Sequence, residues 1–354
     1  MHRRTAAAAF LLALPLSAQT TSVTAPTITA PTFHRTRTVW FVNDTNPIGA
    51  EVGFGAEELA WTKDAEKAFT SASPGTRIAL GASMWAALET FSDLEFGKTK
   101  VKAGNHYAVL AKTKDGFALE LLDPDAVRKA QEVPGVAKGV KSTASIALTA
   151  EKADESPLRA EWKPGEDGTA QLTIRFGPHS LRAQASVAGS KGANPIALPD
   201  PRGASRVAFA KNAFAVVDHG VPAWSEEHAR EAKEPKNGAR WRLGKDWATT
   251  LDTNLPLAIG DKTLAAGSWH LVLGRTAKGW NLVASQAAAD HKAKLDGFAA
   301  QYVTPVMETA LTESAANPLA DKLRIEFVAE GKGTVLAISF GDQRLSVPVA
   351  PAKT

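Results

Sequence analysis

The side chains that could do chemistry in this 354-residue chain are histidines, carboxylates and arginines, because cysteine is absent. Without cysteine there is no thiolate nucleophile, no thiolate metal ligand and no disulfide. No H-E-x-x-H motif is present, and after His2 the histidines are scattered: His34, His106, His179, His219, His228, His270 and His291. A metal site needs ligands that converge in space, which a linear pattern can hide. On this pattern we expect neither a metal nor another cofactor.

The polar residues most suggestive of a reaction lie in and beside the stretch from 238 to 274. Arg242 and Asp246 stand four positions apart, and His219 and His270 flank them in the sequence. An arginine, an acid and a histidine in one concave pocket could carry out hydrolysis. The Arg–Asp pair could equally form a structural salt bridge, which we favour. These four residues are therefore catalytic candidates only if the chain is an enzyme, and the sequence favours a protein without catalysis.

Tryptophan is the other conspicuous feature, with five of the nine tryptophans between 224 and 280. An exposed tryptophan in a β-domain can stack on a sugar ring, whereas a buried one is a large core residue. A glycan-binding protein requires Trp247 or Trp269 to lie flat and exposed, and packing is the favoured alternative. The candidates for ligand binding are Trp241, Arg242, Asp246, Trp247, Thr249 and Trp269.

Other short motifs are better explained as structure than as sites. The stretch "FGKTK" at 96–100 resembles the end of a phosphate-binding loop, but Ser92 stands where the first glycine is required. Ser83 in "GASMW" lacks the G-x-S-x-G spacing of a nucleophile elbow. The following acid pairs are typical of strand faces and helix starts rather than of facing glycosidase carboxylates: Asp93 with Glu95, Glu57 with Glu58, and Glu226 with Glu227.

The N-terminus has the pattern of an export signal. His2, Arg3 and Arg4 precede the apolar run 6–16, which is too short to span a membrane. We therefore expect a signal peptide at 1–18 and an exported protein, periplasmic or extracellular, without an integral membrane segment after signal removal. The Thr- and Pro-rich residues 19–37 predict an extended tether.

The net charge argues against nucleic acid as a partner. The chain carries 41 Lys and Arg against 37 Asp and Glu, a formal charge of +4. Arg3 and Arg4 belong to the expected signal, so the exported protein is nearly neutral. No basic stripe with interleaved aromatic residues is present, and we expect no nucleic-acid binding. The sequence predicts no particular oligomeric state.

The chain contains an internal repeat at an offset of 163 residues. Residues 75–122 and 238–285 align without gaps and share 15 identities in 48 positions, many of them turn glycines and core leucines. Short alternating runs separated by glycine turns predict antiparallel strands. Helices are expected only at 61–69, 123–133, 224–234 and 284–302, and Ser225 is the candidate N-cap of the third.

These patterns predict a mainly β protein made of two tandem, related antiparallel β-sandwich or open-barrel domains with a few short helices. The expected first domain spans 38–188, and the second, less degenerate one spans 206–354. Between them, the Gly- and Pro-rich residues 189–205 predict a linker.

The second repeat resembles a bacterial exported family, domain of unknown function 2911. The family pattern W-R-[ST]-G-A-N-x-A-T corresponds to Trp241 through Thr249, and its G-x-x-[LV]-x-A-G-x-Y-x-[LF] corresponds to Gly260 through Leu271. Within these stretches Asp246 replaces the family's asparagine. Upstream, His219 and Val221 replace its tyrosine and arginine. The resemblance is weak in the first repeat, and it implies a fold and no established activity.

Together these observations predict an exported, non-enzymatic binding or structural protein of the bacterial cell envelope. The expected partner is a glycan or another envelope protein. The alternative is a hydrolase-like enzyme with a single active site in the C-terminal repeat. The first repeat lacks Trp241, Arg242 and Thr249 of the second, so any site is expected in the second alone.

Overall fold

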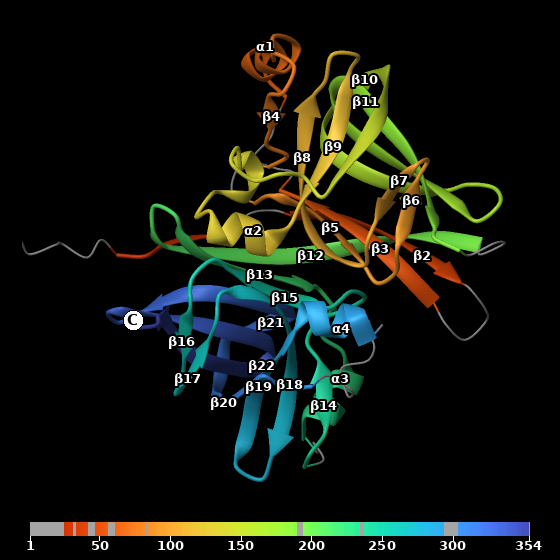
Figure 1. The fold of residues 1–354 in the computed structure, drawn as a ribbon. Coiled ribbons are helices and arrows are strands. Elements are labelled where there is room, and N and C mark those ends of the chain that lie inside the picture. Colours follow the sequence, from red (N-terminus) through yellow and green to blue (C-terminus); the bar gives the residue numbers. More distant parts are fainter. Residues whose placement is uncertain are drawn as a thin grey trace, which may run out of the picture.

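The fold is a two-lobed, mainly antiparallel β-structure, seen in a computed structural model (Figure 1). The structure describes residues 25–30, 33–41, 47–55, 61–81, 84–189, 194–233, 237–293 and 304–353. The expected signal peptide at 1–18 lies outside these residues. Within them, no helix is long and apolar enough to cross a membrane. The fold class predicted from the sequence is confirmed: mainly β, with antiparallel sheets and short helices.

The N-terminal half has two layers of strands. The first layer runs in the spatial order β2, β3, β5, β8, β9, and continues into β10; the second runs β10, β11, β6, β7, with β4 beside β8. Strand β10 belongs to both layers because it pairs first with β9 and then with β11. The bounds are β2 Phe33–Phe41, β3 Pro47–Phe54, β4 Arg77–Ile78, β5 Ala86–Thr90, β6 Leu94–Phe96, β7 Thr99–Val101, β8 Gly104–Lys112, β9 Phe117–Leu122, β10 Ala144–Pro164 and β11 Thr169–Val187.

The C-terminal half has the same order of strands. Its first layer runs β12, β13, β15, β18, β19, β20, and its second runs β21, β22, β16, β17, with β14 beside β18. The bounds are β12 Asn194–Ala210, β13 Ala213–Gly220, β14 Arg240–Arg242, β15 Thr249–Thr253, β16 Leu257–Ile259, β17 Lys262–Leu264, β18 Gly267–Thr276, β19 Gly279–Gln286, β20 Met307–Ala310, β21 Thr312–Glu330 and β22 Gly333–Pro351.

The predicted linker is wrong over its described part, because β12 runs through it. This strand pairs with β2 of the N-terminal half over 194–202 and with β13 of the C-terminal half over 202–210 (Figure 1). Its prolines Pro195, Pro199 and Pro201 stand at alternate positions in the part of the strand that pairs only with β2. A proline has no N–H to donate, and such positions face the edge of the strand where no partner needs a donor. The segment that the sequence predicts to be a linker is therefore, over its described part, the strand that joins the two halves.

The predicted tether at 19–37 is also wrong in its described part. β1 (Thr27–Thr29) pairs with 206–208 of β12, and β2 pairs with both β3 and β12. Threonine-rich segments form strands readily when a partner strand is available. The N-terminal segment therefore supplies sheet structure to both halves.

Four α-helices and one 3-10 turn connect the strands within the described residues. The α-helices overlap the four predicted helices but are shorter, and the 3-10 turn follows the second of them. Residue 234 of the third prediction and residues 294–302 of the last lie outside the described part. The predicted N-cap Ser225 accepts the backbone N–H of His228 at 3.3 Å, which satisfies a donor of the first helical turn. The bounds are α1 Lys63–Thr70, α2 Pro124–Lys129, η1 Pro134–Val136, α3 Glu226–Lys233 and α4 Ala287–Ala293.

Each half has its own hydrophobic core between its two layers. One core uses residues from Trp40 to Val187, and the other uses residues from Val207 to Val349. A third apolar cluster joins the halves, where Trp85 packs against Phe214 with ring centroids 4.9 Å apart. The outer face of β5 and β8 therefore packs against the outer face of β13, β15 and β18.

Candidate functional site

Because successive side chains of a strand point to opposite faces, charged side chains lie at the surface between the two halves. In β5, Leu88 points into the N-terminal core, so its neighbour Glu89 points to the opposite face. In β18, Trp269 and Leu271 point into the C-terminal core, so His270 points outward between them. Because these two outer faces pack together, Glu89 and His270 meet.

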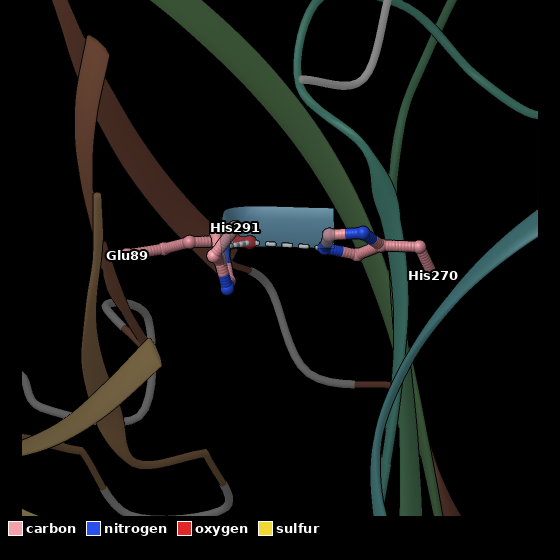
Figure 2. A group of neighbouring side chains, drawn as sticks. All are labelled: Glu89, His270 and His291. Atoms are coloured by element: carbon pink, nitrogen blue, oxygen red, sulfur yellow. Dashed lines mark hydrogen bonds and ion pairs between the residues drawn. The ribbon is translucent and has the colours of Figure 1, made fainter. Parts of the chain in front are cut away.

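Glu89, His270 and His291 form a buried group that we call the histidine cluster. Figure 2 shows Glu89 and His270 reaching toward each other from opposite strands, with His291 of α4 beside them. Glu89 Oε1 lies 3.1 Å from His270 Nε2 and 2.9 Å from His291 Nε2. The three side chains are 2%, 5% and 2% exposed, respectively. One potential ligand atom of each lies within 4.8 Å of the other two, which is close enough to hold one metal ion.

Further buried groups fix the orientation of the cluster. His270 Nδ1 lies 2.8 Å from Asp290 Oδ2 and carries the hydrogen of this contact, because a carboxylate can only accept. Ser285 donates to the same oxygen at 2.6 Å. Trp247 donates its indole N–H to Glu89 Oε2 at 2.7 Å. The other carboxylate oxygen, Oε1, and the two imidazole Nε2 atoms therefore point at one another.

The electrostatics of the cluster follow from burial and close contact. Burial alone would raise the pKa of Glu89, but the hydrogen bonds and charges of His270 and His291 outweigh it and hold that pKa well below its usual range. Burial alone would lower the pKa of His270, but the hydrogen bonds that it donates to Asp290 and Glu89, together with their charges, outweigh burial and raise that pKa to about 9. The site is thus built around an ionised carboxylate and favours a cation beside it.

The ion network extends from the histidine cluster along the junction. Arg35 lies 3.9 Å from Glu89, 3.2 Å from Glu51 and 3.0 Å from Asp218. Arg202 of β12 also pairs with Asp218. These charges are buried, and removal of one partner leaves another uncompensated. The network ties β2 and β12 to the strands that carry the cluster.

A second buried group, which we call the arginine cluster, stands nearby and consists of Asp252, Tyr107 and Arg128. Tyr107 donates to Asp252 Oδ2 at 2.6 Å, and Arg128 donates to Oδ1 at 2.7 Å. Arg128 also donates to Ser268 Oγ at 2.6 Å, and Asn105 donates to the same oxygen at 3.4 Å. Burial and the charge of Asp252 raise the pKa of Tyr107 well above its usual value, so its phenol stays protonated.

The two clusters correspond residue by residue. In each, a strand carboxylate of one half meets a strand side chain of the other half, and a helix side chain, from α2 or α4, supplies the third member. The members stand 163 positions apart in three pairs: Glu89 and Asp252, Tyr107 and His270, and Arg128 and His291.

Two of the predicted ligand-binding residues line a separate cavity in the C-terminal half. Trp241 and Arg242 of β14 border a space of about 500 Å³. Trp241 also packs against Trp280, with ring centroids 4.9 Å apart. The rest of the wall is mostly apolar, and His228, Lys245 and Gln343 supply polar side chains. Its other residues are Pro222, Trp224, Leu243, Gly244, Leu273, Trp280, Leu323, Ile338, Phe340 and Leu345.

Asp246 and Thr249 support the loop beside this cavity. The Asp246 backbone has φ +64°, and its carbonyl accepts from Arg242 Nη1 at 3.2 Å. The Asp246 carboxylate lies 3.2 Å from Arg37 Nη2 rather than at Arg242. The Thr249 hydroxyl donates to the carbonyl of Leu243.

Trp247 and Trp269 are buried, so neither offers the flat, exposed ring that sugar stacking requires. Trp247 is 4% exposed and Trp269 is 6% exposed. Trp269 belongs to the C-terminal core and donates its indole N–H to the Ala265 carbonyl at 3.1 Å. The condition set for a glycan-binding protein is therefore not met by either ring, and both are packed, which is the alternative favoured from the sequence.

The imidazole of His219 contacts backbone groups of two strands in the C-terminal half. Its Nδ1 lies 2.9 Å from the carbonyl of Gly220, and its Nε2 accepts the N–H of Ile325 at 3.1 Å. Burial lowers the pKa of His219 to about 4, more strongly than its hydrogen bond to Gly220 raises it. It is therefore a neutral side chain bridging two strands.

The structure does not bring the four catalytic candidates into one pocket. Arg242 borders the cavity, Asp246 pairs with Arg37, His219 bridges the backbone, and His270 lies in the histidine cluster. The sequence analysis selected His270 but missed its partners Glu89 and His291. A usable signal was present, because Glu89 aligns with the acidic Asp252 in the repeat.

Comparison with known proteins reaches only the C-terminal half. Residues 217–349 match the protein family of unknown function DUF2911. The DUF2911 region includes His270, His291 and the cavity residues Trp241 and Arg242, whereas Glu89 lies outside it. No curated protein and no solved structure matches the chain.

Proposed function

We propose that this chain is an exported, non-enzymatic binding protein of the bacterial cell envelope, and that its C-terminal half binds a small molecule with a ring-shaped apolar body and an acidic group. The observation that carries this proposal is the cavity of about 500 Å³ bordered by Trp224, Trp241 and Trp280. Cavities of this size with mostly apolar walls and a few polar groups are typical small-molecule sites.

The wall of the cavity indicates the chemistry of the ligand. The faces and edges of tryptophan rings favour contact with flat apolar or aromatic groups. Arg242 and Lys245 border the same space and supply positive charge. An arginine can hold a carboxylate, sulfonate or phosphate oxygen through charge-assisted hydrogen bonds. An acidic amphiphile fits both features better than a neutral sugar does.

The corresponding position in the N-terminal half is less suited to a ligand. There a cavity of about 390 Å³ is bordered by Ile78 and Ala79, which stand where the C-terminal half has Trp241 and Arg242. Phe69 of α1 also borders it, and stacks on Phe117 with ring centroids 4.3 Å apart. The N-terminal cavity therefore keeps the aromatic side chains Trp61, Phe69 and Phe176 but lacks equivalents of Trp241 and Arg242. Its own Arg77 is paired with Glu120.

We infer that the two halves descend from a tandem duplication in which only the second copy kept the ligand site. The repeat of 163 residues supports this, as do matched contacts in the two halves. A Cβ at Gly177 would collide with Trp61, and one at Gly341 would collide with Trp224, so each tryptophan packs directly on a glycine. The residue pattern of the expected signal peptide at 1–18 supports export.

A dye-binding experiment tests the ligand site. The anionic dye 1-anilinonaphthalene-8-sulfonate combines fused rings with an acidic group, and we expect saturable 1:1 binding to the folded full-length chain. Trp241→Ile copies the N-terminal half and should weaken binding about tenfold, equivalent to about 1.4 kcal/mol. Arg242→Ala should weaken the sulfonate dye while leaving the uncharged N-phenyl-1-naphthylamine unchanged.

The matched control is Ile78→Ala in the N-terminal cavity, which should leave dye binding unchanged. Near-UV circular dichroism establishes that each variant keeps its packed core. Dye binding that is absent, or that is insensitive to Trp241→Ile, would contradict the proposed ligand site. Displacement of the dye by envelope oligosaccharides but not by acidic amphiphiles would point instead to a glycan ligand.

A further inference from the structure

We propose that the histidine cluster is a binding site for one divalent transition-metal ion of the zinc class, held between the two halves by Glu89, His270 and His291. The N-terminal half supplies the carboxylate, and the C-terminal half supplies both imidazoles. A metal bound there would connect β5 to β18 and α4. The proposal is independent of the proposed ligand cavity.

The spacing of the three ligand atoms fits a shared metal. Glu89 Oε1 lies 3.1 Å and 2.9 Å from the two Nε2 atoms. Zinc binds nitrogen and oxygen at about 2.0–2.2 Å, which places neighbouring ligands of one ion roughly 3–3.5 Å apart. The two distances to Glu89 therefore already match those around one ion, and one potential ligand atom of each residue lies within 4.8 Å of the other two.

The surroundings of His270 have the form that metal-bound histidines show. A ligating imidazole usually donates its other ring N–H to a carboxylate, which fixes the tautomer and leaves the second nitrogen for the metal. Here Nδ1 donates to Asp290 at 2.8 Å, and Ser285 in turn donates to Asp290. His270 Nε2 is thereby directed at Glu89 Oε1.

The donor set selects the class of ion. Two imidazole nitrogens and one carboxylate oxygen suit zinc and neighbouring transition metals, whereas magnesium and calcium prefer oxygen ligands. The arginine cluster shows what the same framework does without a metal: the guanidinium of Arg128 supplies a permanent cation beside Asp252. His291 stands at the corresponding position beside Glu89, where an imidazole can bind an ion instead.

Zinc binding to untagged full-length protein tests this inference. Because the site is buried, the chain is unfolded with a chelator, dialysed, and refolded with zinc alone before unbound metal is removed. We expect about one zinc per chain by elemental analysis in wild type, and below about 0.1 in Glu89→Gln and in His291→Gln. Bound zinc should also raise the melting temperature of wild type, and not that of either variant.

Three matched variants keep the test decisive. Asp252→Asn changes the carboxylate of the arginine cluster, His228→Gln removes a histidine outside the site, and Trp241→Ile alters the ligand cavity; all three should keep one zinc per chain. Cobalt(II) in place of zinc should give visible absorption bands that vanish in His291→Gln. Absence of bound zinc in folded wild type, or equal zinc in wild type and Glu89→Gln, would overturn the proposal and leave a proton as the shared cation.

Discussion

The histidine cluster and the arginine cluster place similar frameworks around different cations. Each consists of a carboxylate from a first-layer strand, a side chain from the facing strand of the other half, and a side chain from a following helix. In the arginine cluster the cation is a guanidinium, which stays charged at all ordinary pH values. In the histidine cluster the corresponding positions hold imidazoles, whose charge depends on a bound proton or metal.

The difference shows how one packing arrangement can serve two purposes. The arginine cluster opens onto a cleft of about 490 Å³ lined by both halves, and its charges are satisfied by the chain itself. The histidine cluster is almost fully buried and is extended by Arg35 toward Glu51 and Asp218. The permanent cation suits a structural contact, whereas the exchangeable one suits a site whose state can change.

The largest effect should come from removing the carboxylate of the histidine cluster. Glu89→Ala leaves His270, His291 and the Trp247 indole without their shared acceptor, and we expect the free energy of unfolding to fall by about 3–5 kcal/mol. Asp252→Ala should cost less, about 1–3 kcal/mol, because Arg128 keeps its salt bridge to Asp125 at 2.6 Å. Urea unfolding of both variants and wild type at pH 7.5 measures the difference.

This comparison fails if Asp252→Ala destabilises the chain as much as Glu89→Ala does. Equal losses would mean that the two clusters contribute alike despite their different burial and cations. Lys102→Ala serves as the control, because its salt bridge to Asp93 lies at the surface, and such pairs contribute about 0–1 kcal/mol.

The next largest effect concerns the stability of the protein in acid. It arises from one position at which the C-terminal half has a histidine and the N-terminal half has a phenylalanine. Strand pairing places Phe54 of β3 and His219 of β13 at corresponding positions. The pKa of His219 falls to about 4 in the folded protein, below the ordinary value of about 6.5. Below pH 6.5 the unfolded chain therefore binds a proton that the folded chain does not bind.

The stabilising contribution of a neutral His219 should thus be complete above pH 6.5 and lost as the pH falls toward 4. A shift of this size corresponds to about 3 kcal/mol. His219→Phe copies the N-terminal half and should remove this part of the acid sensitivity. Urea unfolding of both proteins between pH 4.5 and 7.5 checks the expectation, and parallel pH profiles would contradict it.

Most of the fold could be predicted from local patterns, whereas the pairing of distant segments could not. Alternating apolar residues and glycine turns identified the hairpins of both halves, and Ser225 marked a helix start. The errors fell on β1, β2 and β12, where proline and threonine gave the composition of a tether and a linker. Those segments form strands because partners more than 150 positions away complete their hydrogen bonds.

The candidate site was only partly predictable for a related reason. His270 was selected for its position near Arg242, yet its partners are Glu89, 181 positions away, and Asp290. No local spacing reveals that contact. Comparing outward-facing polar residues between the repeats would have pointed to it, because Glu89 aligns with the acidic Asp252.

The smallest predicted effect tests whether the two clusters are energetically separate. Ser268 Oγ accepts from Arg128 at 2.6 Å and from Asn105 at 3.4 Å. Ser268→Ala should cost about 1 kcal/mol, since it removes one acceptor of a charged donor. Asn105→Ala should cost about 0.5 kcal/mol because its hydrogen bond to Ser268 is long.

Double-mutant cycles then assign the serine to one cluster. Ser268→Ala should couple to Asp252→Ala by more than about 0.5 kcal/mol, because both changes act on the same guanidinium. Combined with Glu89→Ala, the costs should add, because no contact of Ser268 involves the imidazoles. Coupling to Glu89→Ala of the same size would show that the junction responds as one network, and the division into two clusters with separate cations would have to be abandoned.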